Sequence, residues 1–258
     1  MITLLTPSKT MDFVTPVPAH VTSTSPVFSD EAIMIRTMLM TQSAAAISEL
    51  MHVSAMLAEQ VVGMYKNNDA KKPAAWTYTG DVFKGYQAST LTKDAAIFAQ
   101  EHLLIASGVY GVLRPNDAIQ PYRLEMKTKL SIEGARNLYD FWGERLGQYI
   151  ETLPNLAGEL CVLSSEEYAK AALLHLPKKI RIVTPVFIDL RPNGKEGQVP
   201  IYNKMMRGVM AHWIMENRID SVSQLPQFSG HGYNYSVERS APDRPVYYRQ
   251  VMTPLRFS

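Results

Sequence analysis

Residues 107–126 concentrate residue types that can bind an anion. Gly108 and Gly111 stand three residues apart after an apolar, helix-periodic segment, and Arg114 and Arg123 follow. Glycines permit positive φ, and a glycine turn can present several backbone N–H groups to a phosphate. Nearby arginines can bind the same anion with two hydrogen bonds each. The pattern is typical of a phosphate-binding loop, but a helix C-cap followed by a tight turn gives the same pattern, so both interpretations stay open.

Two further places combine a cation with a structural setting that suits anions. The apolar run 2–5 predicts a buried strand, and the small-residue loop after it carries Lys9. That loop lacks the glycines of a P-loop, and an ordinary turn is its alternative interpretation. Lys204 and Arg207 lie one turn apart at the start of a helix expected over 204–219. A basic pair there opposes the helix dipole unless an anion binds.

Carboxylates beside cations are how sites tune pKa values, which makes acid–base chemistry a second possibility. The candidate catalytic residues are Lys9, Asp81, Glu125 and Glu167. For Glu125 the alternative is a buried pair with Arg123 that holds the loop. Convergence of these groups in a closed pocket of ~300–1,000 Å³ favours a small ligand, whereas an open groove favours nucleic acid.

The composition is that of an ordinary globular chain with one locally basic stretch. The 258 residues carry a net charge of +2, but residues 178–218 hold eight Lys/Arg against three Asp/Glu. Such a stretch fits a localised anion site or a solvated face. The single cysteine, Cys161, lies in an apolar run and excludes an internal disulfide, which fits a reducing cytoplasm. We expect no signal peptide and no membrane span, because no apolar stretch approaches ~18 residues.

The histidines give no indication of a metal centre. No two of the six histidines stand three or four residues apart, and the sequence has no cysteine cluster. We therefore expect no metal site and no cofactor, although ligands brought together from distant parts of the chain stay open.

Strand and helix patterns alternate irregularly along the chain. The expected helices cover 47–62, 93–106, 136–150 and 204–219, and a further helix starts at Ser164, with Glu167 as its capping-box partner. The expected strands are 2–5, 76–79, 160–163, 181–190 and 199–202, with an edge or bulge at Pro185. This order predicts a single α/β (α+β) domain over residues 1–258, with a mixed β-sheet flanked by helices.

Ordered motifs along nearly the whole chain resemble those of the peroxide stress protein YaaA family. They are TPSKTMD (6–12), YTGDVFKG (78–85), residues 102–126, LYDFWG (138–143), SEEY (165–168), PVF (185–187), YNKMMRG (202–208), ENR (216–218) and GY (232–233). The resemblance implies a cytoplasmic protein that helps bacteria survive hydrogen peroxide by limiting free iron and oxidative DNA damage. It also implies an α/β fold with a basic cleft and a helix-hairpin-helix element, which maps onto residues 107–114.

The resemblance further implies DNA binding, in which such a hairpin contacts phosphates without reading bases. The expected nucleic-acid or anion-binding residues are Lys9, Ser107, Gly108, Tyr110, Gly111, Arg114, Tyr122, Arg123, Lys204, Arg207 and Arg218. The alternative is an enzyme or binding protein for a small phosphorylated, nucleotide- or nucleobase-like ligand in the same cleft. The sequence implies neither an enzymatic activity nor an oligomeric state.

Overall fold

A parallel sheet lies at the centre of the computed structural model, which describes residues 1–66 and 70–250. The strand order is β4-β3-β1-β6-β7, with β1 in the middle. The strands are β1 (Ile2–Leu5), β3 (Leu103–Ser107), β4 (Gly111–Leu113), β6 (Glu159–Leu163) and β7 (Arg181–Val183). β3, β1, β6 and β7 run parallel, and β4 runs antiparallel to β3. The predicted strands at 2–5 and 160–163 are confirmed.

A second sheet and a two-stranded ribbon complete the β-structure. The second sheet has the order β10-β11-β12-β8-β9, and β2 pairs with β5. Their bounds are β8 (Val186–Leu190), β9 (Glu196–Gly197), β10 (Ser229–Gly230), β11 (Tyr233–Tyr235), β12 (Val246–Arg249), β2 (Lys72–Pro73) and β5 (Ala118–Ile119). β12 and β8 run parallel, whereas the other pairs in this sheet are antiparallel. Both sheets are mixed, as the sequence predicts.

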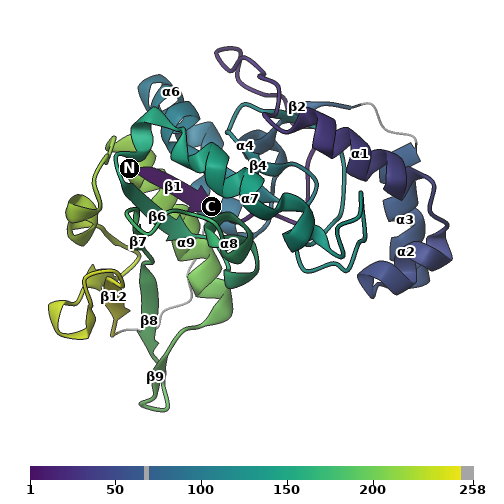
Figure 1. The fold of residues 1–258 in the computed structure, drawn as a ribbon. Coiled ribbons are helices and arrows are strands. Elements are labelled where there is room, and N and C mark those ends of the chain that lie inside the picture. Colours follow the sequence, from purple (N-terminus) through teal and green to yellow (C-terminus); the bar gives the residue numbers. More distant parts are fainter. Residues whose placement is uncertain (67–69, 251–258) are drawn as a thin grey trace.

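Helices cover both faces of the central sheet. They are α1 (Ser29–Met40), α2 (Ala44–Met51), α3 (Ala55–Lys66), α4 (Ala74–Thr77), α5 (Asp81–Tyr86), α6 (Lys93–His102), α7 (Leu138–Glu151), α8 (Glu166–Leu173) and α9 (Pro200–Glu216). Short 3₁₀ turns cover Ala88–Thr90, Pro154–Leu156, Val222–Gln227 and Val237–Arg239. α6 and α9 pack on each other and on β1, while α7 and α8 pack on each other and on β4 and β3. Figure 1 shows α1, α2 and α3 gathered at one end and β8, β9 and β12 at the other.

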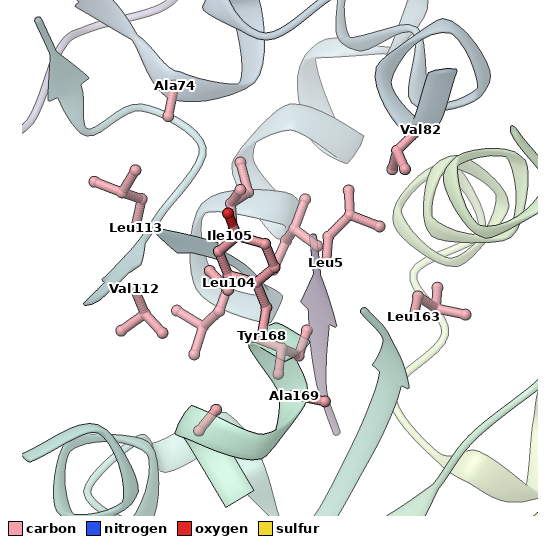
Figure 2. Packing of buried hydrophobic residues seen from close by; sticks show 14 of the residues in the cluster. Leu5, Ala74, Val82, Leu104, Ile105, Val112, Leu113, Leu163, Tyr168 and Ala169 are labelled. Atoms are coloured by element: carbon pink, nitrogen blue, oxygen red, sulfur yellow. The ribbon is translucent and has the colours of Figure 1, made fainter. Parts of the chain in front are cut away.

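The core sits between these layers. Leu5, Ile105 and Leu163 come from three neighbouring strands and are fully buried. Figure 2 shows them with Tyr168 of α8 and Val82 of α5 around the ends of the strands. Because parallel strands are buried on both faces, they read as continuous apolar runs rather than alternating ones. The predicted α/β class is confirmed, and its expected range of 1–258 extends at 67–69 and 251–258 beyond the described residues.

Two predicted helices are too long. The helix expected over 93–106 ends at His102, and the chain continues as β3 beside β1. An apolar run fits a helix or a buried strand equally well, so periodicity alone does not separate them. The helix expected over 47–62 breaks at His52, which adopts a left-handed φ of 51°. Ser54 then caps α3 by accepting the amide of Leu57, which starts a new helix.

Three predicted strands also need correction. Residues 74–77 form the short helix α4 instead of a strand at 76–79. Pro185 divides 181–190 into two strands of different sheets, because proline has no N–H to donate to a ladder. The strand expected at 199–202 is the first turn of α9, where Pro200 occupies the position that needs no amide donor.

Candidate anion-binding cavity

A cavity of about 570 Å³ lies at the carboxyl ends of β1 and β6. The chain passes from β1 to β3 on one side and later returns to β6 and β7 on the other, so strand order reverses between β1 and β6. Open α/β sheets bind ligands at such a reversal. The lining residues are Thr6, Pro7, Ser8, Lys9, Thr10, Thr79, Gly80, Asp81, Val82, Lys84, Glu125, Lys127, Ser165, Glu167, Tyr168, Lys204 and Arg207.

The loop after β1 is held against the start of α5. Ser8 Oγ accepts hydrogen bonds from the amide of Gly80 at 2.8 Å and from that of Thr10 at 3.0 Å. A Cβ at Gly80 would collide with the Ser8 side chain, so only glycine allows this approach. The contact fixes the loop that carries Lys9 at the edge of the cavity.

Two further glycines bring α5 and α9 into backbone contact. A Cβ at Gly85 would collide with the carbonyl of Met205, and a Cβ at Gly208 with the carbonyl of Val82. Side chains at these positions would separate the two helices. Their absence places Asp81 and Lys84 of α5 beside Lys204 and Arg207 of α9 in one wall.

The carboxylates of the cavity hold most of its lysines. Glu125 pairs with Lys9 at 2.6 Å and with Lys127 at 3.3 Å, and Asp81 pairs with Lys84 at 3.5 Å. Burial raises the pKa of Glu125, but the hydrogen bonds and charges of Lys9 and Lys127 outweigh burial, and the pKa falls below its usual range. A carboxylate with a lowered pKa is a weak general base at neutral pH. Glu125 is therefore suited to holding Lys9 and Lys127 in place and poorly suited to abstracting a proton.

The two cations of α9 differ from the lysines around them. The side chains of Lys204 and Arg207 line the cavity, and neither makes a hydrogen bond or ion pair with another described residue. Arg207 is half-buried, and burial lowers the pKa of its guanidinium. The group still stays protonated at neutral pH. A desolvated cation without a counter-charge is costly, and a bound anion would remove that cost.

The amino end of α8 adds to this electrostatic environment. Its N-cap is Ser165, and not Ser164 as predicted, and the Ser165 hydroxyl lies 3.4 Å from Thr6 Oγ1 instead of capping an amide. Glu167 is not a capping-box partner, because its carboxylate accepts the amide of Lys127 at 3.2 Å. Because the amino end of α8 lies at the cavity, the helix dipole adds partial positive charge there. Overall, five basic and three acidic side chains line it.

The structure brings together six residues that the sequence singled out. Lys9, Asp81, Glu125, Glu167, Lys204 and Arg207 all line the cavity. The helix that carries the last two begins one turn earlier than predicted, so they project from its second and third turns rather than from its amino terminus. Sequence reasoning did not select Lys84 and Lys127. Lys84 stands three residues after Asp81 and Lys127 two residues after Glu125, and this spacing could have indicated that they pair with the candidate carboxylates.

The glycine turn at 107–111 lies elsewhere and is buried. It joins β3 to β4, so residues 103–113 form strand, turn and strand rather than the expected helix-hairpin-helix element. The amides of Val109 and Tyr110 both donate to Ser107 Oγ. A Cβ at Gly108 would collide with the carbonyl of Leu124, so this glycine serves close packing. These donors are already used, which corrects the phosphate-binding interpretation of the turn.

Tyr122 supports the same buried turn. Its hydroxyl lies 2.6 Å from that of Tyr78 and 2.8 Å from Ser107 Oγ. Tyr110 is also buried, and its hydroxyl accepts the amide of Gln120. Burial raises the pKa of Tyr122 above its ordinary value, so the hydroxyl stays neutral. These tyrosines hold the loop in place and do not line the cavity.

The remaining predicted arginines are also outside the cavity. Arg114 pairs with Asp117 at 3.1 Å and donates to the carbonyl of Ser25. Arg123 is half-buried and is not paired with Glu125, whose partners are lysines. Arg218 follows the last turn of α9, about 21 Å along the helix axis from Lys204. The predicted arginines therefore do not form one site.

Within residues 1–66 and 70–250, no group of three or more His, Cys, Asp or Glu side chains is arranged to hold a metal ion. Nor does any helix in these ranges have the length and apolarity needed to cross a membrane. Cys161 is fully buried, and burial raises the pKa of its thiol. Because the thiolate is the reactive form, this cysteine is poorly placed to react with peroxide.

Fold and cavity together define an α/β protein with a cavity of net positive charge at the reversal of strand order. Residues 1–239 match the family described as peroxide stress protein YaaA. A UPF0246 protein of Ralstonia nicotianae is 40% identical over 261 residues, covering 97% of this chain and all of its own. UPF0246 proteins of Bordetella avium and Azoarcus sp. are 37% and 39% identical, each over 97% of this chain and 100% and 99% of their own. The chain belongs to the peroxide stress protein YaaA family.

Proposed function

We propose that this peroxide-stress protein binds a small phosphate-bearing ligand in the cavity at the ends of β1 and β6. The observation that carries the proposal is the pair Lys204 and Arg207, which lines the cavity without a partner among the described residues. Arg207 offers a planar fork of donors that suits phosphate, and Lys204 adds a mobile point charge. A volume of about 570 Å³ is the size of a site for a small organic ligand.

The charged residues that line the cavity have different roles in ligand binding. Lys204 and Arg207 bind the phosphate oxygens, while Glu125 holds Lys9 and Lys127 at the opposite side. The carboxylates of Asp81, Glu125 and Glu167 can accept hydrogen bonds from hydroxyl groups of the ligand. No reaction is assigned, because the lowered pKa of Glu125 makes it a weak base.

Calorimetric titration of ribose 5-phosphate and inorganic pyrophosphate tests this function. We expect Arg207→Gln to weaken binding at least about tenfold, the size of a lost charge-assisted hydrogen bond. Arg218→Gln is the matched control, because Arg218 follows the same helix at its far end and is exposed. Affinity that is equal in wild type and Arg207→Gln would refute the proposal.

Exposed lysines around the mouth of the cavity favour a second function, which is the binding of DNA. Lys9, Lys84 and Lys127 are each more than half exposed, and Lys204 is exposed too. These lysines come from separate segments around one opening and would contact successive phosphates. The contacts would carry no base specificity and would place the family's protection of DNA on this face.

Duplex and bubble DNA binding across a salt series tests the second function. Four phosphate contacts predict a slope of log K against log salt of about −3 to −4. Lys84→Gln/Lys204→Gln should flatten the slope by about two, whereas Lys178→Gln/Lys179→Gln, a basic pair outside the cavity, should leave it unchanged. A slope near zero would refute DNA binding.

We also propose that the link to iron is indirect and that the protein works in the cytoplasm, as the family's role in limiting free iron implies. The ligand bound in the cavity, rather than iron itself, would be what the protein senses or sequesters. Iron titration of the wild-type protein should then show no binding that Glu125→Gln or Glu167→Gln removes.

A further inference from the structure

A second pocket of about 520 Å³ opens beside the cationic cavity. The two share Thr79 and Lys84, which form the boundary between them. The second pocket is lined by Thr15, Pro16, Lys72, Ala75, Trp76, Tyr78, Thr79, Phe83, Lys84, Gln87, Ala88, Ser89 and Thr90. The two pockets are therefore neighbours, and Lys84 belongs to the lining of both.

The second pocket differs in chemistry from the first. Three aromatic residues line it, and Tyr78 and Phe83 pack against each other at 4.9 Å between ring centroids. Its deep cation, Lys72, is engaged by Asp12 through a 2.9 Å bond to the carbonyl and a 3.4 Å contact to the carboxylate. The pocket therefore suits a flat, uncharged, apolar-faced group rather than a second phosphate.

Trp76 contributes an aromatic side chain to this pocket. Its indole Nε1 is buried and has no hydrogen-bond acceptor among the described residues. An atom that water cannot reach does not face the open pocket, so Trp76 offers its ring and not its N–H to a ligand. A flat heteroaromatic ring that packs against these aromatic side chains suits the pocket.

We propose that the ligand is a nucleoside monophosphate, with its heteroaromatic base in the Trp76 pocket and its phosphate on Lys204 and Arg207. The inference rests on the proposed phosphate-binding function and names its ligand class. Base–aromatic stacking contributes to affinity with little dependence on which base is bound. Thr15, Ser89 and Thr90 are exposed at the rim and offer hydroxyl groups to the base edge.

The test compares each of the four ribonucleoside 5′-monophosphates with ribose 5-phosphate, which lacks only the base. We expect the tightest nucleotide to bind at least about tenfold better than ribose 5-phosphate. Trp76→Leu should erase this advantage and leave ribose 5-phosphate binding unchanged. Trp76→Phe, which keeps a smaller aromatic ring, should lose part of it. Trp213→Leu is the control, because Trp213 is also half-buried and lines neither pocket.

The other outcomes separate the two proposals. Equal affinities for nucleotide and ribose 5-phosphate, both weakened by Arg207→Gln, would overturn the base pocket and support the phosphate site. A nucleotide advantage that survives Trp76→Leu would overturn the placement of the base. Failure of every phosphorylated probe to bind in an Arg207-dependent way would overturn the phosphate site and the inference with it. Thermal unfolding of each variant confirms that it is folded before titration.

Discussion

The turn after β3 and the cavity beyond β1 contain similar residue types, but their polar groups differ in whether they already have hydrogen-bond partners. In the turn, Ser107 already accepts two amides, and the glycines touch neighbouring backbone and side chains. In the cavity, Lys204 and Arg207 line open space without a partner in the described part of the chain. Glycine, serine and cations therefore support structure in one place and suit binding in the other. What separates the two roles is whether the polar groups are already hydrogen-bonded.

Substitution of the buried turn should have the largest effect on stability. Gly111 has a φ of +67°, and a Cβ there would lie 2.7 Å from Leu146 and 2.8 Å from Trp142. We expect Gly111→Ala to lower the free energy of unfolding by about 3 kcal/mol, through left-handed backbone strain plus overpacking. Urea denaturation measures this loss.

Gly134→Ala is the matched control for that substitution. Gly134 also has positive φ, at +80°, but a Cβ there would meet nothing within 4 Å. Its expected cost is backbone strain alone, about 1–2 kcal/mol. Equal losses at Gly111 and Gly134 would contradict the close packing of the turn.

A smaller effect should come from the hydroxyl network under the turn. Tyr122→Phe removes hydrogen bonds to Tyr78 and Ser107 and should cost about 1–2 kcal/mol of unfolding free energy. Tyr86→Phe should cost nothing or stabilise slightly, because the buried Tyr86 hydroxyl has no partner among the described residues. Both variants should keep wild-type affinity for ribose 5-phosphate. Weakened binding in Tyr122→Phe would show that the turn contributes to the site.

Acidification should change the stability contributed by the cavity's ion pairs, and this is the smallest expected effect. Because the pKa of Glu125 is lowered in the folded protein, its ion pairs stabilise the fold above the ordinary glutamate pKa of 4.5. That contribution should fade as pH falls from about 4.5 through the lower folded pKa, by about 0.5 kcal/mol for a solvent-reachable pair. Chemical denaturation of wild type and Glu125→Gln at pH 7 and pH 3 measures it. Stability differences that are the same at both pH values would exclude this linkage.

Sequence patterns predicted the mixed α/β class because short strand-like runs, such as those at β1 and β6, alternate with longer helix-periodic segments. They also selected Lys9 and the α9 cations by local setting, and the structure places these residues in one cavity. Helix ends were harder to predict. The segment after His102 is apolar enough for helix or strand, and its pairing with β1, about a hundred residues away, determined the outcome.

The turn at 107–111 was misinterpreted for a different physical reason. Two glycines three residues apart fit both a phosphate-binding turn and a turn that must pack closely, and the sequence does not reveal the neighbours. Leu124, Leu146 and Trp142 come from distant segments and fill the space around it. The Trp76 pocket was missed because Trp76 and Tyr78 come from a segment predicted as a strand, whereas Trp76 lies in α4, Tyr78 follows it, and Phe83 lies in α5.

The backbone contact between α5 and α9 has a consequence for ligand affinity. Gly85 and Gly208 let the two helices touch without intervening side chains, so the backbone of the wall that carries Lys84, Lys204 and Arg207 is assembled when the protein folds. The entropic cost of ordering this wall is met during folding rather than at association. Preorganisation of this kind lets a small ligand with few contacts bind tightly, and it makes residues at the α5–α9 contact, which never touch the ligand, determinants of its residence time.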